Sequence, residues 1–539
     1  MHKLMNHVPK NRGTIYILIG VIIFLILTSY LWNFTVDDAY ISFRFASHLT
    51  QGQGLVWNLN SMPVEGYTNF LWVLLSTIAF ILKIDPVIFT RIINSISLIG
   101  IMIIFWKLSK DVFDDDKSLA YLSFSFGVLI LLSNPATVVH FLSGLETFTY
   151  SFFVLAITFF AFKIIKSKNS KAIWIFSILG FLTGLLRPEG FLITAGLFFL
   201  ILIFFKKYHH DQVINIIKSF SLFFMFPIAL YMSFRLNYFN EIFPLPFLVK
   251  TMNYGGFNNF TENFSLYYVI PILFVIVPSI YYATRKKANS FDTFSTETKY
   301  VLFLIIILIV AVCANFIYIN MSLIMNYAQR FFYPTLVLLY ILSAISIVLI
   351  KDNINCVRSI RFSKSIEIVL VILLIFSNIY FLPEIAYTKN YATDLNEAHI
   401  PLGKALEQYS DHNYTAVCID VGAIPYYSKW KFIDLEGLTD VFIAKNHEIS
   451  YDYLSKNDPE LIILVSGDGV DVDLYAAHNQ KIPYKYVIQN NYTALSPIKF
   501  NKRYYFIPFL KPGIDGYDKI SNTINEVAKS SKNEKDEFK

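Results

Sequence analysis

Apolar runs separated by short polar segments fill most of the first 380 residues. Twelve of these runs approach the roughly 20 residues needed to cross about 30 Å of hydrocarbon. They lie at 14–34, 68–83, 86–106, 118–134, 145–163, 171–186, 189–206, 213–235, 264–283, 299–320, 329–350 and 365–382. Because backbone polar groups in lipid must be satisfied internally, the pattern predicts a polytopic α-helical membrane protein of about 11 to 13 spans.

Basic residues concentrate in short loops on alternate sides of these runs, which places those loops on the inner side of the membrane. The inner clusters are Lys163/Lys166/Lys168/Lys171, Lys206/Lys207, Arg285/Lys286/Lys287 and Lys351/Arg358/Arg361/Lys364. This alternation puts the N-terminus inside and the C-terminal region outside, so the number of crossings must be odd. Either the short run 68–83 does not cross fully, or the break at Ser133-Asn134-Pro135 hides another segment.

After Pro383 the chain changes from lipid-compatible to soluble in character. Strands are predicted at 414–420, 431–434 and 460–465, and a later β-rich piece includes 484–489 and 503–509. We therefore expect three regions: a bundle over 1–382 with outer loops 35–67 and 235–264, an extracytoplasmic α/β domain over 383–520, and a disordered tail over 521–539.

Composition agrees with a membrane protein and excludes other classes. Of the 539 residues 55% are hydrophobic and only 16% are charged, and the net charge of +6 resides in the inner loops. The charge therefore does not indicate nucleic-acid binding. The three cysteines have no spacing for a metal site, so structural zinc and redox chemistry are not expected.

The first outer loop begins with two carboxylates, Asp37 and Asp38, at the membrane edge, where charged groups are costly and usually functional. A short helix from Asp38 to Leu49 is predicted to lie in the membrane interface, with Trp57 as an interfacial anchor. A carboxylate here suits either a general base for an incoming hydroxyl or a ligand for a divalent cation. Because adjacent residues point in different directions, only one of the two is expected to face a cavity.

Other ionisable residues fall in outer loops and converge on the same side of the bundle. Four cations, Arg44, Arg187, Arg330 and Lys250, are candidates for binding a phosphate and its developing negative charge. Ordinary roles remain open beside these. An aspartate pair can simply cap a helix, Arg187 can snorkel to the interface, Glu146 can favour a helix dipole, and His140 can be a packed histidine.

The order of several motifs resembles the GT-C membrane glycosyltransferases related to the mycobacterial terminal β-arabinofuranosyltransferase. The motifs are Val36-Asp37-Asp38-Ala39-Tyr40-Ile41-Ser42-Phe43-Arg44, Gly52-Gln53-Gly54-Leu55-Val56-Trp57-Asn58, Val64-Glu65-Gly66-Tyr67-Thr68-Asn69-Phe70-Leu71-Trp72, Ser143-Gly144-Leu145-Glu146-Thr147, Leu186-Arg187-Pro188-Glu189-Gly190, Gln329-Arg330-Phe331-Phe332-Tyr333-Pro334, Asp420-Val421-Gly422-Ala423-Ile424-Pro425-Tyr426-Tyr427 and Asp434-Leu435-Glu436-Gly437-Leu438-Thr439-Asp440. Together with the loop from Arg235 to Lys250, the resemblance spans most of the chain to about residue 445.

The resemblance implies an inverting transferase in the bacterial cytoplasmic membrane, with its active site on the outer face beneath a periplasmic C-terminal domain. Asp38 or Asp37 would be the catalytic base. The donor would be a polyprenyl-phosphate sugar, with arabinofuranose or another pentose favoured. The acceptor would be a surface glycan, lipid or glycoprotein. The expected substrate-binding residues are Glu65, Tyr67, Glu146, Glu189 and His140. Because the chain is dense in Ile, Lys, Asn, Tyr and Phe, unlike a mycobacterial sequence, the sugar and the acceptor remain open.

Three other hypotheses stay beside this one. A related enzyme would move a hexose or aminoarabinose onto lipid A. A transporter or flippase of lipid-linked sugars would also need charged residues in a bundle, although no inverted repeat is evident and the charges gather on one face. A non-catalytic envelope assembly protein would use the soluble domain for docking.

No cofactor is certain from the sequence. Asp37, Asp38, Glu65 and Glu146 offer the oxygen ligands that Mg²⁺ or Ca²⁺ prefers, whereas the four cations could neutralise a phosphate without a metal. The oligomeric state is not indicated.

Overall fold

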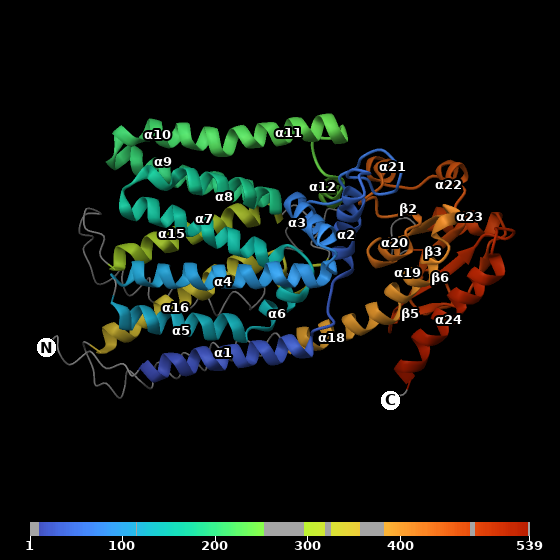
Figure 1. Cartoon of the computed structure of the whole chain (residues 1–539), viewed down its shortest axis with the longest axis horizontal. Helices are drawn as coiled ribbons and strands as arrows, with labels where there is room; N and C mark the ends of the chain where they lie inside the picture. Colours follow the sequence, from blue (N-terminus) through green and yellow to red (C-terminus); the bar gives the residue numbers. More distant parts are fainter. Residues whose placement is uncertain are drawn as a thin grey trace.

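A computed structural model describes residues 10–114, 116–252, 296–318, 325–355, 382–474 and 480–536. The predicted spans 264–283 and 365–382 lie outside these ranges, apart from Leu382. In Figure 1 a helical bundle occupies one end of the molecule and an α/β domain the other, as predicted.

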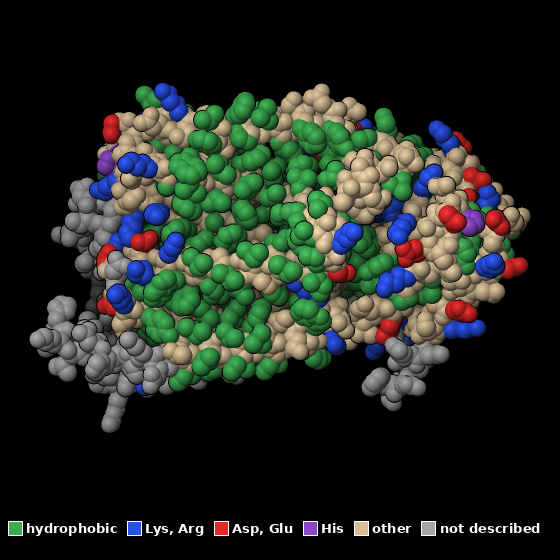
Figure 2. Space-filling model, in the orientation of Figure 1, with side chains coloured by type: hydrophobic (Ala, Val, Ile, Leu, Met, Phe, Trp, Pro, Cys, Tyr) green, Lys and Arg blue, Asp and Glu red, His purple; other side chains and the backbone are tan. Residues whose placement is uncertain are grey.

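Helices make up the whole described bundle. Their bounds are α1 (Lys10–Tyr30), α2 (Asp37–Thr50), α3 (Phe70–Ile81), α4 (Pro86–Val112), α5 (Lys117–Ser133), α6 (Pro135–Leu142), α7 (Thr147–Ser167), η1 (Ser170–Ala172), α8 (Ile173–Leu186), α9 (Glu189–Tyr208), α10 (His210–Phe220), η2 (Ser221–Met225), α11 (Phe226–Phe239), α12 (Leu245–Met252), α15 (Thr296–Tyr318), η3 (Tyr327–Gln329) and α16 (Tyr333–Asn355). On the face seen in Figure 2, hydrophobic side chains form a broad band over this bundle, between two ends that carry most of the charges.

Six described helices are long and apolar enough to cross a membrane, or seven if α5 and α6, which meet at 65°, count as one broken span. By contrast α3 has only 12 residues, which corresponds to about 18 Å of helix, well short of about 30 Å of hydrocarbon. Removing α3 from the twelve predicted spans leaves the odd number that the charge alternation requires. The length of α3 fits the first of the two explanations, and the number of crossings stays a prediction.

The end of the bundle away from the α/β domain carries the two basic clusters that are fully described, at 163–171 and 206–207, and Figure 2 shows Lys and Arg side chains gathered at this end, on the left. There Lys166 at the end of α7 pairs with Asp111 at 2.7 Å, and Lys299 of α15 pairs with Asp114. We call this the inner end and the opposite one the outer end, following the positive-inside rule.

Helix α2 is formed as predicted, but protein surrounds it instead of lipid. It packs against α3 and against α20 (Ala423–Ser428) of the α/β domain, and its side chains are buried on all faces from Tyr40 to Ala46. Trp57, predicted as an interfacial anchor, is likewise buried, and its indole N–H donates to the Phe432 carbonyl at 3.2 Å. The aromatic residues of the first outer loop thus form the joint between the two domains.

The α/β domain contains one mixed sheet in the order β2-β1-β3-β6-β4, with β5 paired to β6. Its strands are β1 (Thr415–Cys418), β2 (Lys431–Asp434), β3 (Leu461–Ser466), β4 (Thr493–Ala494), β5 (Ile498–Asn501) and β6 (Tyr504–Leu510). Its other elements are α18 (Leu382–Glu397), α19 (His399–Glu407), η4 (Ser410–His412), α20, α21 (Val441–Asn446), α22 (Tyr451–Asn457), α23 (Lys481–Gln489) and α24 (Tyr517–Asp536). Strands β1, β2 and β3 run parallel, and β6 runs antiparallel to β3.

Two predictions in this domain were wrong. Residues 484–489 belong to helix α23, which carries Pro483 in its first turn, where proline is tolerated, and buries Tyr486 and Val487. The tail predicted to be disordered over 521–539 forms helix α24 as far as Asp536. Its apolar residues recur at helical spacing, and Ile520, Ile524 and Ala528 are buried against the domain.

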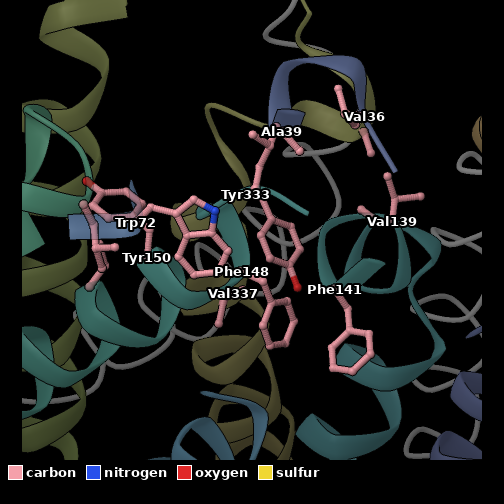
Figure 3. Packing of buried hydrophobic residues seen from close by; sticks show 14 of the residues in the cluster. Val36, Ala39, Trp72, Val139, Phe141, Phe148, Tyr150, Tyr333 and Val337 are labelled. Atoms are coloured by element: carbon pink, nitrogen blue, oxygen red, sulfur yellow. The ribbon is translucent and has the colours of Figure 1, made fainter. Parts of the chain in front are cut away.

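Aromatic packing fills the bundle directly beneath the outer end. Figure 3 shows Ala39 of α2 above the rings of Tyr333 and Phe148, which stack with their centroids 6.3 Å apart. Nearby, the indole N–H of Trp72 donates to the Gly144 carbonyl at 3.0 Å. This core supports the loops described next.

Candidate active site

An ion cluster joins four outer segments that are far apart in the sequence. Glu146 lies 3.0 Å from the guanidinium of Arg187 and 3.5 Å from that of Arg330. Arg187 also contacts Glu189 at 2.5 Å, and Arg330 also contacts Asp38 at 3.4 Å. Four of the predicted site residues thus gather around Glu146, and we call these five residues the ion cluster.

Local sequence explains how these side chains are positioned. Glu146 is the N-cap residue of α7, so its backbone begins the helix while its side chain remains at the outer end. Arg187 ends α8 in an extended conformation, as expected for the residue before proline. Pro188 then starts α9, in whose first turn Glu189 lies next to Arg187.

The Glu146 carboxylate remains charged despite its burial. Burial alone would raise the pKa of Glu146, but Arg330 and Arg187 lower it below its usual range. The amide of Asn69 also donates to Glu146 at 2.8 Å. Glu146 therefore acts as the anion that holds two cations at the outer end.

Asp38 is the accessible carboxylate of the ion cluster. Its side chain is 30% exposed, against 2% for Glu146 and 4% for Glu189. Its ion pair with Arg330 is long, at 3.4 Å, whereas the Glu146 and Glu189 carboxylates are held closely by Arg187. Among the carboxylates of the cluster, Asp38 is thus the one best placed to meet an incoming group.

Lys250, on α12, lies within electrostatic reach of the cluster. Burial lowers the pKa of the Lys250 amine, and Asp38 acts against that shift while Arg330 adds to it. Within the described part of the chain Lys250 makes no ion pair at 4 Å or less. It therefore supplies a positive charge that the surrounding carboxylates do not already hold in direct contact.

The turn that carries Arg330 has an unusual backbone. Met325, Ala328 and Gln329 all have left-handed φ angles, of 61°, 44° and 59°, although none of them is glycine. Such conformations cost of order 1 kcal/mol or more and persist only when the surroundings enforce them. Both polar backbone groups of Ala328 are held here: Glu384 accepts its N–H at 2.7 Å, and the His140 ring bonds its carbonyl at 2.9 Å.

His140, predicted to bind substrate, lies in α6 with its side chain inside the bundle. It is fully buried and packs on Tyr333, with ring centroids 4.5 Å apart. Its contact with Ala328 positions the turn before Arg330. Binding of substrate by His140 stays a prediction.

Asp37 points away from the ion cluster and into the α/β domain. Its two carboxylate oxygens accept the backbone N–H groups of Gly422 at 3.0 Å and Ala423 at 2.8 Å. A Cβ atom on Gly422 would collide with Asp37, so glycine is needed at this contact. Burial raises the pKa of Asp37 to about 6, against the opposing effect of His399. Asp37 joins the two domains.

Arg44, predicted to bind phosphate, is also part of that joint. Its guanidinium donates to the carbonyls of Trp57 at 2.9 Å and Trp430 at 2.7 Å, to the Pro425 carbonyl, and to the Asn58 side chain at 3.2 Å. It is 3% exposed. Because its donors are used by carbonyl and amide oxygens on both sides of the joint, Arg44 is not presented to a phosphate.

Glu65 and Tyr67 lie outside the ion cluster as well. Glu65 pairs with Arg235 of α11 at 2.8 Å and accepts a hydrogen bond from Tyr231 at 3.2 Å. Its carbonyl accepts the N–H of Leu245, the first residue of α12. Tyr67 packs edge-on against Phe45 at 4.8 Å. These contacts fix the start of the helix that carries Lys250.

The four predicted metal ligands do not form a common site. Asp37 is bound by the backbone at Gly422, Glu65 by Arg235 and Glu146 by Arg187. Within the described ranges no group of three or more His, Cys, Asp or Glu side chains is arranged to hold a metal ion. The dependence on a divalent cation stays a prediction.

Two further members of the site had no assigned role in the sequence prediction. Asn69 links Glu146 to Ser42 of α2 through its amide. Tyr318, at the end of α15, bonds Glu189 and accepts from Arg187 at 3.3 Å. Asn69 lies inside a motif that carried the family resemblance, so a signal for it was present, whereas Tyr318 lies at the end of an apolar run that offers no such signal.

Comparison with known proteins supports the fold. A family model described as "Domain of unknown function (DUF8728)" matches residues 384–510, which is most of the α/β domain. Among curated proteins no match is found.

Solved structures share the arrangement of the whole chain. ArnT from Cupriavidus metallidurans bound to undecaprenyl phosphate is 11% identical, with a TM-score of 0.57, over 93% of this chain and 98% of that one. The apo state of that protein is 10% identical, with a TM-score of 0.52, over 97% and 99%. The archaeal oligosaccharyltransferase AglB from Archaeoglobus fulgidus is 13% identical, with a TM-score of 0.49, over 83% and 69%. The predicted fold, a polytopic α-helical membrane bundle with a C-terminal α/β domain, is confirmed.

Proposed function

We propose that this protein is an inverting glycosyltransferase that moves a sugar from a polyprenyl-phosphate donor to an acceptor at the outer end of the bundle. The observation that carries the proposal is Asp38, the one accessible carboxylate of the ion cluster, placed beside Arg330 and within reach of Lys250. The fold adds support, because ArnT, which has a similar fold, was solved with undecaprenyl phosphate bound.

Asp38 would act as the general base. The acceptor hydroxyl gives its proton to the Asp38 carboxylate while its oxygen forms a bond to the anomeric carbon of the donor sugar. The bond from that carbon to the phosphate oxygen breaks, and polyprenyl phosphate leaves from the opposite face of the sugar. A positioned general base of this kind contributes roughly 10²- to 10⁴-fold to a rate.

Charge balance in the site supports this sequence of events. Asp38, Glu146 and Glu189 offset Arg187, Arg330 and Lys250, so these six side chains sum to zero. As the phosphate gains one negative charge on leaving, Asp38 loses one by protonation. Arg330 then faces a neutral carboxyl group on one side, and its positive charge becomes available to the leaving phosphate together with that of Lys250.

The finer assignments follow from the sequence resemblance. We propose a pentose, with arabinofuranose as the favoured sugar, and an acceptor that is a surface glycan, lipid or glycoprotein. The protein would reside in the bacterial cytoplasmic membrane with its α/β domain on the periplasmic side. A hexose or aminoarabinose donor is the related alternative.

The experiment is sugar transfer by the purified full-length chain in lipid vesicles. Polyprenyl phosphates that carry arabinofuranose, aminoarabinose or a hexose are supplied one at a time, with crude cell-envelope acceptor, with and without EDTA. Release of polyprenyl phosphate is measured. Asp38→Asn should lower release from the true donor by about 10²- to 10⁴-fold.

Asp458→Asn is the matched control, since this carboxylate is 61% exposed and pairs with Lys511 at the surface of the α/β domain. It should release polyprenyl phosphate at the wild-type rate. If Asp38→Asn turns over as fast as the control, or if no donor is consumed by the wild type, the transferase proposal is wrong. Translocation of lipid-linked sugar across the vesicle membrane would then be the next assay.

A further inference from the structure

A cavity of about 350 Å³ lies beside the first turn of α2, between that turn, η3 and α18. Its volume falls within the roughly 300–1,000 Å³ of small-molecule sites. Its described lining consists of Phe34, Val36, Met325, Asn326, Tyr327, Glu384, Tyr387, Thr388 and Tyr391. We call it the α18 cavity; none of its lining residues belongs to the ion cluster.

Aromatic rings form much of the wall. Phe34 lies edge-on to Tyr327, with centroids 6.2 Å apart, and edge-on to Tyr391, at 6.1 Å. Tyr387 tilts against Tyr391 at 6.3 Å. Aromatic faces carry negative charge density, which attracts the polarised C–H groups on the apolar face of a sugar ring.

A carboxylate completes this wall. One oxygen of Glu384 is occupied by the N–H of Ala328 at 2.7 Å. Among the described residues no side chain or backbone group bonds the other oxygen, which can accept a hydrogen bond from a ligand hydroxyl. Burial raises the pKa of Glu384, as expected for a carboxylate in a partly enclosed space. A polyprenyl tail would have to cover this polar group without bonding it, which is costly, whereas a saccharide hydroxyl would satisfy it.

The α18 cavity adjoins the proposed base. The hydroxyl of Tyr391 accepts the backbone N–H of Asp37 at 3.1 Å, so the wall of the cavity touches the residue before Asp38. Burial, and to a smaller extent the Asp38 charge, raises the pKa of both Tyr327 and Tyr391. The cavity wall therefore meets the chain one residue before Asp38, and the Asp38 charge acts on two of the tyrosines that line the cavity.

We propose that the α18 cavity binds the terminal saccharide of the acceptor. This inference rests on the proposed transferase function and names the substrate class that approaches Asp38. It also assigns a role to α18, the first helix of the α/β domain, which brings Tyr387, Glu384 and Tyr391 to the bundle.

Tyr387 allows the proposal to be tested without disturbing the fold, because it lines the cavity while 55% of its surface is exposed. Tyr387→Ala removes the ring, and Tyr387→Phe keeps it. Tyr30→Ala is the matched control: Tyr30 is 52% exposed, lies at the end of α1 and contacts Lys389 of α18, but does not line the cavity.

Binding is measured first, independently of turnover. Methyl glycosides of arabinofuranose, glucose, galactose and mannose are added to the vesicle-reconstituted full chain, and saturation transfer from protein to sugar is recorded by NMR. At least one glycoside should receive saturation from the wild type, Tyr387→Phe and Tyr30→Ala, and less than half as much from Tyr387→Ala. Equal signals in all four proteins, or none in the wild type, would overturn the assignment.

Kinetics then separate this inference from the proposed function. Tyr387→Ala should raise the acceptor KM about tenfold, the effect of losing one aromatic contact. Tyr30→Ala, outside the cavity, should leave the acceptor KM and the release of polyprenyl phosphate at the wild-type values. Donor consumption with an unchanged acceptor KM would refute the cavity assignment alone. Absence of donor consumption in the wild type would refute the transferase function instead.

Discussion

The backbone N–H of Ala423 donates a hydrogen bond of 2.8 Å to the Asp37 carboxylate, across 386 positions of sequence. The second oxygen of Asp37 accepts the neighbouring N–H of Gly422. The adjacent Asp38 carboxylate instead faces Arg330 in the ion cluster. Two consecutive aspartates thus have separate roles, one at the domain joint and one in the proposed chemistry.

Asp37→Asn should lower stability without removing the proposed base. The amide would present its NH₂ group to a backbone N–H, so that one hydrogen bond is lost and two donors face each other. The expected loss is about 1–3 kcal/mol of unfolding free energy, measured as a lower thermal midpoint in detergent. Gly422→Ala should lower the midpoint in the same way, since its Cβ would collide with Asp37.

Asp38→Asn is the isosteric comparison, and its midpoint should stay close to that of the wild type. The opposite pattern would contradict these assignments. If Asp37→Asn keeps the wild-type midpoint but no longer releases polyprenyl phosphate, then Asp37 takes part in the chemistry.

Arg44→Lys tests whether Arg44 belongs to the joint or to a phosphate site. A lysine ammonium cannot reach four oxygens spread over Trp57, Asn58, Pro425 and Trp430, so buried acceptors would lose their donors. We expect a loss of about 2–4 kcal/mol in unfolding free energy, with an unchanged donor KM in the folded fraction. Arg330→Lys should raise the donor KM instead.

Arg503→Lys, at an exposed position of the α/β domain, is the control for the exchange itself and should change neither quantity. If the donor KM rises in Arg44→Lys as much as in Arg330→Lys, Arg44 binds the donor phosphate after all.

The sequence allowed the bundle and the ion cluster to be predicted because both follow from local rules. Apolar runs must span lipid, and charges at the membrane edge are costly enough to indicate function. Arg187 and Glu146 were therefore found by position alone. Arg44 was misassigned because its partners are backbone carbonyls at Pro425 and Trp430, and a carbonyl has no signature in the amino-acid sequence.

Helix α24 was also mispredicted, in this case because the prediction relied on composition. Its composition is that of a solvated tail, but four apolar side chains recur on one face and find a surface to pack on. Composition averages over the faces of a helix, whereas packing depends on one face. The left-handed turn at Ala328 was equally beyond prediction, because its conformation is enforced by His140 and Glu384 from distant parts of the chain.

The joint should become less stable as the pH rises. His399 bonds Asp420 at 3.0 Å. Burial lowers the pKa of the His399 imidazole, but Asp420 and Asp37 more than offset this and raise it. A raised histidine pKa contributes stability that is complete below the unfolded value of about 6.5 and is lost as the pH rises through the folded value. Asp37, whose pKa is raised to about 6, acts in the same direction.

The measurement is the thermal midpoint at about pH 6 and about pH 8. The wild type should lose more stability over this interval than His399→Gln, in which the titrating group is absent. His412→Gln, at the surface of the same domain, should behave as the wild type. A pH dependence that is identical in wild type and His399→Gln would show that the joint does not titrate through this residue.

Ala328→Gly should uncouple stability from activity. Alanine at a φ of 44° carries strain that glycine does not, and glycine in turn loses roughly 0.5–1 kcal/mol through greater freedom in the unfolded chain. These effects nearly cancel, so the thermal midpoint should stay the same or rise slightly. Release of polyprenyl phosphate should nevertheless fall about tenfold, because the turn that places Arg330 two residues later becomes looser.

Asn491→Gly provides the control, since Asn491 has a similar φ of 53° at an exposed turn of the α/β domain. Both its midpoint and its turnover should match those of the wild type within error. If Ala328→Gly keeps full turnover, the strained backbone does not set the position of Arg330. If its thermal midpoint instead falls by the equivalent of more than about 2 kcal/mol, the left-handed φ of Ala328 does not strain the backbone. We expect stability to be kept and activity to be lost. The contacts of His140 and Glu384 hold Ala328 in its strained conformation, and this conformation positions Arg330.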